Sequence, residues 1–102
     1  MSIFIKTERF KKETLDLLPE QRREYIEEHL AWALNLKNAG LNIASGYLVN
    51  ELGYAGGGGF LVLEAKKFEE AKLIIIEDPM IKNHLVDWEI QQWISVIGEI
   101  LN

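Results

Sequence analysis

The central stretch LNIASGYLVNELGYAGGGGFLVLE (residues 41–64) predicts two consecutive strands of a hairpin. From Leu41 to Asn50 two sets of side chains alternate, and a period of two residues is typical of a strand. The segment ELGYAGGGG (residues 51–59) is expected to be a loop, and Phe60 to Glu64 the next strand. In this prediction the glycine run Gly56–Gly59 belongs to a flexible loop that could cover a pocket.

Helices are predicted on both sides of this hairpin. Upstream, Pro19 to Ala39 reads as one long helix, because proline is favoured in a first helical turn and Gly40 suits the position after the last one. Downstream, Lys66 to Ile76 reads as a short helix that ends before Asp78-Pro79, since the residue preceding a proline is disfavoured in helices. The long helix gathers its apolar side chains on one face, whose members are Tyr25, Ile26, His29, Leu30, Trp32, Ala33 and Leu36.

Two further strands flank these elements. Residues 2–7 form the first predicted strand and His84 to Ile97 the last, with a suspected bulge at Gln91-Gln92. Residues 8–19 are a charged insertion between the first strand and the long helix. With short connections and right-handed crossovers, this order predicts an α+β, ferredoxin-like βαββαβ fold: a four-stranded antiparallel sheet with two helices on one face.

The second face of the predicted sheet has no helix to cover it. The strands nevertheless carry apolar side chains at both parities, as where Phe4 lies between Ile3 and Ile5, and Trp93 beside Ile94. The simplest alternative is that these are apolar residues scattered over an ordinary surface, but the strands carry more apolar side chains than one buried face needs. We therefore expect a homodimer in which two sheets pack face to face around a twofold axis.

The composition of the chain excludes or disfavours several classes of function. The chain has 102 residues, enough for one domain (residues 1–102), and 48% of them are apolar, which excludes wholesale disorder. Its net charge of -5 makes nucleic acid and an anionic membrane surface poor partners. The absence of cysteine excludes thiolate catalysis, cysteine-ligated zinc and iron–sulfur clusters. Without a signal peptide or a long apolar run, a cytoplasmic location is expected.

His29 and Asp78 are the candidates for acid–base chemistry. His29 lies inside the apolar face of the long helix, an environment that suits a proton-transfer group. In the predicted topology the second helix ends near the first half of the long helix, which brings Asp78 toward His29. An aspartate bonded to one ring nitrogen would fix the tautomer and leave the other nitrogen as a general base. The structural alternatives are a core histidine bonded to a backbone carbonyl and an ordinary Asp-Pro turn.

The sequence gives less support to the other residues that could form a functional site. Trp32 lies one turn after His29 and could form the wall of a pocket for a flat ligand, although core packing explains it as well. The glycine run lacks the Gly-Lys-Ser/Thr ending of a phosphate-binding loop and leads into a strand. His84 and Asp87 have opposite parity in the last strand, so they cannot form a second pair. With only two histidines and no ligand cluster, no metal is expected.

Several short motifs together resemble the YCII-related family, also called YciI-like. They are His29-Leu30, Ala44-Ser45-Gly46, the glycine-rich loop, Glu64, Phe68-Glu69-Glu70-Ala71 and Asp78-Pro79, and the resemblance extends from about residue 2 to residue 97. It implies a dimeric α+β barrel of ferredoxin-like protomers and a site with a His–Asp pair, matching His29 and Asp78. One branch of the family eliminates chloride from a chlorinated hydroxyquinol, and fold relatives include muconolactone isomerase, so small aromatic or lactone substrates are implied. The 8–19 insertion and the bare GGGG depart from the family pattern.

The leading hypothesis is a cofactor-independent lyase or isomerase that acts on a small aromatic or unsaturated molecule. His29 would be the general base and acid, Asp78 would orient it, and Trp32, Ser45 and Gly46 would contact the substrate. The alternative is a non-catalytic domain that binds a small molecule or serves as an accessory subunit. A haem-degrading or quinone-forming monooxygenase is a third interpretation, which rests on fold analogy alone.

Overall fold

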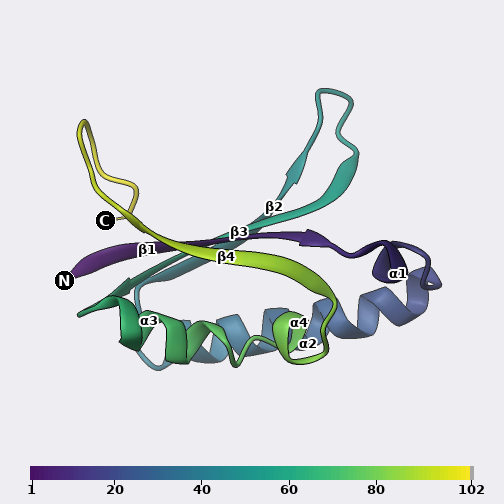
Figure 1. Cartoon of the computed structure of the whole chain (residues 1–102), viewed down its shortest axis with the longest axis horizontal. Coiled ribbons are helices and arrows are strands. Elements are labelled where there is room, and N and C mark those ends of the chain that lie inside the picture. Colours follow the sequence, from purple (N-terminus) through teal and green to yellow (C-terminus); the bar gives the residue numbers. More distant parts are fainter. Residues whose placement is uncertain (102) are drawn as a thin grey trace.

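The computed structural model of the chain describes residues 1–101 and contains a four-stranded antiparallel sheet in the order β2-β3-β1-β4. All the helices lie on one face of this sheet (Figure 1). The ferredoxin-like α+β prediction is therefore confirmed, with two short helices added to it. The elements are β1 (Ser2–Phe10), α1 (Lys12–Leu15), α2 (Pro19–Asn38), β2 (Ile43–Val49), β3 (Ala55–Ala65), α3 (Phe68–Ile75), α4 (Pro79–Lys82) and β4 (Val86–Trp93).

The glycine run belongs to a strand and not to the expected loop. β3 begins at Ala55, and Gly58 and Gly59 pair with Arg9 and Glu8 of β1. The connection is shorter than predicted because the side-chain oxygen of Asn50 accepts hydrogen bonds from the backbone N–H groups of residues 52 and 54 and closes a tight turn. Glycine carries no side chain that could reveal a strand period, so the alternation that identifies other strands is missing here.

The predictions for the first and the last strand also need correction. β1 continues to Phe10, so the first residues of the expected insertion extend a strand, and α1 forms within the rest. The pairing of β1 with β4 runs without interruption from Ile3–Trp93 to Phe10–Val86, so the suspected bulge at Gln91-Gln92 is wrong. β4 is shorter than predicted because its last residue, Trp93, pairs with Ile3 near the start of β1, and His84 precedes β4 with a left-handed backbone (φ 56°).

The main core lies between the sheet, α3 and the C-terminal half of α2. Leu63 and Ile75 are completely buried in it, and the ring of Phe4 packs edge-on against Phe68 with centroids 5.7 Å apart. Phe4 belongs to the row of β1 side chains that faces the helices, and the next members of that row are Lys6 and Glu8. The helix-facing row of β1 therefore places two charged residues, Lys6 and Glu8, between the apolar Phe4 and Phe10.

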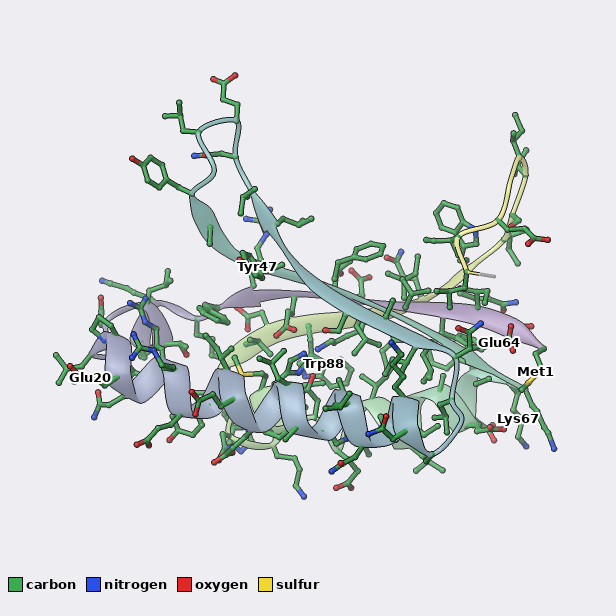
Figure 2. The ribbon with its side chains drawn as sticks, turned by 180° about the vertical axis from the view of Figure 1, so that it is seen from behind. Met1, Glu20, Tyr47, Glu64, Lys67 and Trp88 are labelled. Atoms are coloured by element: carbon green, nitrogen blue, oxygen red, sulfur yellow. The ribbon has the colours of Figure 1, made fainter. Side chains whose placement is uncertain are left out.

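The opposite face of the sheet is left uncovered by helices. The β2–β3 hairpin and the segment after β4 extend on that side, and Tyr47 lies where the hairpin leaves the sheet (Figures 1 and 2). Trp93 on this face is 40% exposed, and Val96 and Ile97 beyond it are at least 90% exposed. In residues 1–101 no helix is both long and apolar enough to cross a membrane.

Candidate functional site

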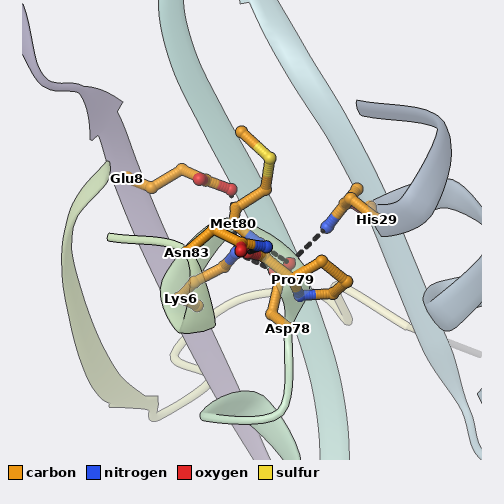
Figure 3. Close-up of polar contacts among 8 residues, drawn as sticks. Lys6, Glu8, His29, Asp78, Pro79, Met80 and Asn83 are labelled. Carbon is orange, nitrogen blue, oxygen red and sulfur yellow. Dashed lines mark hydrogen bonds and ion pairs between the residues drawn. The ribbon is translucent and has the colours of Figure 1, made fainter. Parts of the chain in front are cut away.

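A buried lysine links the charged row of β1 to the helices. The side chain of Lys6 is completely buried, and its Nζ donates to Oδ2 of Asp78 at 2.7 Å and to Oε1 of Glu8 at 2.8 Å (Figure 3). A lone ammonium group in this position would be costly because it has lost its water, whereas two carboxylates compensate its charge. Lys6 therefore requires both acids, and both acids are fixed by it.

Asp78 connects this ion cluster to the long helix. It precedes α4 as the N-cap, and its Oδ1 accepts from the backbone N–H of Met80 at 2.9 Å and from Nδ1 of His29 at 2.9 Å. Its side chain is completely buried. The two interpretations of Asp78 from the sequence are thus compatible, because one carboxylate forms the turn before Pro79 and also contacts the histidine.

The environment of Asp78 keeps it ionised at neutral pH. Burial alone would raise the pKa of Asp78, but the hydrogen bond from His29 and the positive charge and hydrogen bond of Lys6 outweigh that effect, so the pKa is lowered from its ordinary 3.8. An ionised carboxylate only accepts hydrogen bonds. The proton in the Asp78–His29 contact therefore belongs to Nδ1 of the histidine.

This assignment fixes the role of the second ring nitrogen. In a neutral imidazole with a proton on Nδ1, Nε2 is an acceptor, and it lies 2.9 Å from the hydroxyl of Ser45. The expectation that this nitrogen is free is corrected: Nε2 accepts a hydrogen bond from Ser45. Ser45 is exposed on β2, which is an edge strand, so the chain of hydrogen bonds from Asp78 through His29 ends at a solvent-accessible hydroxyl.

A pocket of about 850 Å³ lies beside this hydroxyl and the histidine. Its walls come from β1, β2, β3, Leu15 of α1, residues 19–30 of α2 and Met80 of α4, and they combine apolar side chains with two arginines. A volume in this range suits a small organic molecule. The residues that line it include Glu8, Phe10, Leu15, Arg22, Arg23, Ile26, His29, Leu30, Ser45, Gly46, Gly59 and Met80.

The sequence-predicted substrate contacts separate into two groups. Ser45 and Gly46 line the pocket, while Trp32 does not. Trp32 packs against the main core, with its ring centroid 5.8 Å from that of His29 and the planes tilted by 41°. Trp32 therefore supports the position of the histidine ring from the core side. Within residues 1–101, no three His, Asp or Glu side chains form a group that could hold a metal ion.

Lys6 and Glu8 are functional candidates that the sequence analysis missed. Their positions in the strand could have identified them. Both residues lie on the same side of β1 as Phe4, which faces the helices, and a charged group buried there needs a partner of opposite charge. The signal was hidden because the first strand was expected to end at Thr7, which placed Glu8 in the insertion.

Comparisons with known proteins agree with this architecture. The model of the YCII-related domain family matches residues 3–94. Among solved structures, the 5-chloro-2-hydroxyhydroquinone dehydrochlorinase of Burkholderia phenoliruptrix AC1100, determined in complex with 2,5-dihydroxybenzoquinone, is similar with 23% identity and a TM-score of 0.68, over 89% of this chain and 92% of that one. A dimeric ferredoxin-like protein from an uncultured marine organism has 15% identity and a TM-score of 0.47, with 96% of each chain covered. No curated protein matches the chain.

Proposed function

The chain belongs to the YCII-related domain family, and on that premise we propose that it is a small-molecule enzyme in which His29 transfers a proton. The observation that carries the proposal is the hydrogen-bonded chain from buried Asp78 through His29 to Ser45 at the wall of the pocket. Acid–base groups of enzymes are commonly held in this way, by a buried carboxylate on one side and an accessible cavity on the other.

In the proposed reaction His29 acts first as a base. A substrate group with an acidic C–H or O–H displaces the Ser45 hydroxyl from Nε2, and Nε2 accepts the proton. The imidazolium that forms is stabilised by the negative charge of Asp78 at Nδ1. In an elimination the released electron pair forms a double bond and expels the leaving group, whereas in an isomerisation the imidazolium returns the proton to another atom. No cofactor is needed for either reaction, and positioned proton transfer contributes about 10²–10⁴-fold to the rate.

The pocket favours a small substrate with an apolar body and an anionic group. Apolar side chains such as Ile26 and Leu30 line it, and Arg22 and Arg23 bring positive charge to the same pocket. An aromatic or unsaturated acid fits this combination. The similar dehydrochlorinase acts on a chlorinated, hydroxylated aromatic compound, which supports the same class of substrate for this chain.

Replacement of His29 tests the proposal directly. Chlorinated hydroquinones and unsaturated lactones would be screened by thermal shift, and compounds that bind would be followed by chloride release or absorbance. His29→Gln is expected to lower turnover by about 10²–10⁴-fold, because the proton acceptor is lost. His84→Gln is the matched control, since His84 is the other histidine and is exposed outside the pocket. A folded His29→Gln protein with full turnover would exclude the role of His29.

A non-catalytic binding domain is the second candidate. The observation that favours it is that Nε2 already has a partner in Ser45. In that case a ligand would bind without displacing the hydroxyl, and it would be recovered unchanged. NMR of the imidazole nitrogens with bound ligand separates the two candidates, because only the enzyme requires the Nε2–Ser45 contact to break.

We propose further that two copies associate through the uncovered face of the sheet. The support is the exposed apolar surface of Trp93, Ile94 and the segment that follows, together with the hairpin that extends on the same side (Figure 1). Trp93→Asp is expected to give monomers in sedimentation, whereas Leu73→Asp, an equally drastic change at an exposed position of α3, should leave the mass unchanged. A wild-type monomer would contradict this assembly. The cytoplasmic location expected from the sequence stays a prediction.

A further inference from the structure

Glu8 contains a buried oxygen that the proposed reaction does not use. Oε1 of Glu8 accepts from Lys6 at 2.8 Å, and the side chain is only 9% exposed. Oε2 is buried as well and has no hydrogen-bond partner among residues 1–101. A carboxylate oxygen that has lost its water without gaining a donor destabilises the folded protein, so its position calls for a functional explanation.

The fold holds this side chain at the pocket from two sides. Lys6 fixes one oxygen, and Gly59, the partner of Glu8 in the β1–β3 ladder, leaves the space that the side chain occupies. A Cβ added at Gly59 would lie 2.9 Å from Oε1 and 3.0 Å from Cγ of Glu8, which is too close for an undisturbed side chain. Both residues line the same pocket as His29 and Ser45.

We propose that Oε2 of Glu8 accepts a hydrogen bond from a hydroxyl group of the ligand, so that the pocket selects hydroxylated molecules such as phenols and enols. This inference rests on the proposed function in one respect only, which is that the ligand occupies the pocket beside His29. A carboxylate cannot donate, so an ether oxygen or an ionised oxygen facing Oε2 is repelled, while a neutral hydroxyl supplies the missing donor.

The same contact would orient the ligand toward the histidine. Glu8 and Asp78 bind the same Nζ of Lys6, and Asp78 binds His29, so one rigid, buried chain of contacts joins the two ends of the site (Figure 3). A ligand hydroxyl held by Glu8 would therefore lie at a fixed distance from the ring that transfers the proton. Glu8 selects and positions the ligand, and His29 remains the group that reacts.

Binding of two matched probes tests the proposal without any turnover. 4-Hydroxybenzoate and 4-methoxybenzoate share a ring and a carboxylate, and they differ in the ability to donate a hydrogen bond. The full-length wild-type protein is expected to bind the hydroxyl compound about tenfold more tightly or better, by calorimetry or NMR titration. Glu8→Gln should reduce this preference to about threefold or less, because Lys6 retains the amide oxygen and the amide nitrogen then presents a donor to the pocket.

Control variants make the result specific. Glu13→Gln, at an exposed position of α1 that does not line the pocket, should keep the wild-type preference. Gly59→Ala should reduce it, because its Cβ displaces Glu8, and this variant keeps the proposal testable where Glu8→Gln does not fold. Equal affinities for the two probes in the wild type, no binding of either, or an unchanged preference in both pocket variants would overturn the proposal. His29→Gln should keep the preference, so a failure of the proton-transfer role is recognised separately.

Discussion

The ammonium group of Lys6 lies 2.7 Å from Oδ2 of Asp78, and both side chains are completely buried. This ion pair is the point where β1 meets the turn before α4, and Asp78 passes the connection on to His29 of α2. Contacts of the Asp78 carboxylate thus join β1, α2 and the turn before α4, which are far apart in the sequence. The consequences for stability and chemistry can be measured.

Removal of the lysine charge should destabilise the fold. Lys6→Met keeps most of the length of the side chain but leaves Glu8 without its cation and Asp78 without one of its donors. Because breaking a buried pair leaves an uncompensated charge, we expect a loss of about 3 kcal/mol in the free energy of unfolding, measured with urea. Lys12→Met, at an exposed position of α1, should change this energy by less than about 0.5 kcal/mol. A similarly small loss for Lys6→Met would mean that the buried charges do not stabilise this junction.

Acid should unfold the wild-type protein through Asp78. The pKa of Asp78 in the folded state lies below its ordinary value of 3.8, so the unfolded chain takes up a proton first as the pH falls. The stabilisation is fully present above the unfolded-state pKa and is lost as the pH falls through the folded-state pKa. Asp78→Asn should be less stable at neutral pH and should show a weaker dependence on pH below about pH 5. Asp87→Asn, at an exposed position of β4, is the control, and its free energy of unfolding should depend on pH as that of the wild type does. If Asp78→Asn lost stability in acid as steeply as the wild type, Asp78 would not be the group responsible.

The protonation of the His29 ring provides a spectroscopic prediction. The ionised Asp78 holds the proton on Nδ1, and Ser45 donates to Nε2. Long-range ¹⁵N–¹H NMR at a pH where the ring is neutral should therefore show Nδ1 with its proton and Nε2 without one. In Asp78→Asn the acceptor is no longer ionised, so a mixture of tautomers is expected. A proton on Nε2 in the wild type would reverse the direction of the whole hydrogen-bonded chain.

The sequence was sufficient for those parts of the fold that have a local signature. Pro19 and Gly40 mark the ends of α2, and the alternation after Leu41 marks β2, because these patterns depend only on neighbouring residues. The approach of Asp78 to His29 followed from topology, since helix direction and chain order determine which ends meet. The hydrogen bond between Ser45 and Nε2 could not be predicted, because it depends on the distance of the edge strand from α2.

The glycine run shows a second reason why part of the fold could not be predicted from the sequence. Gly58 and Gly59 pair in the ladder with β1, yet a residue without a side chain leaves no pattern of apolar and polar positions. Glu8 pairs with Gly59 in this ladder, but its charge and its place after Thr7 favour the charged insertion in the sequence analysis. The strand pairing that positions Glu8 at the pocket is thus the part of the site where sequence patterns carry the least information.

The two arginines of α2 should determine the affinity for anionic ligands. Arg22 is half-buried, with its guanidinium donating to the carbonyl of Leu15 at 3.4 Å, and Arg23 is exposed beside the same pocket. The double variant Arg22→Gln/Arg23→Gln should weaken binding of 4-hydroxybenzoate roughly three- to fivefold at low salt and leave binding of phenol unchanged. The wild-type affinity for the acid should also fall as salt is added, because exposed charges are screened. Arg9→Gln, on the face of the sheet away from the helices, is the control, and it should bind both compounds as the wild type does. Equal losses for phenol and for the acid in the double variant would instead indicate that the arginines shape the pocket and do not bind the anion.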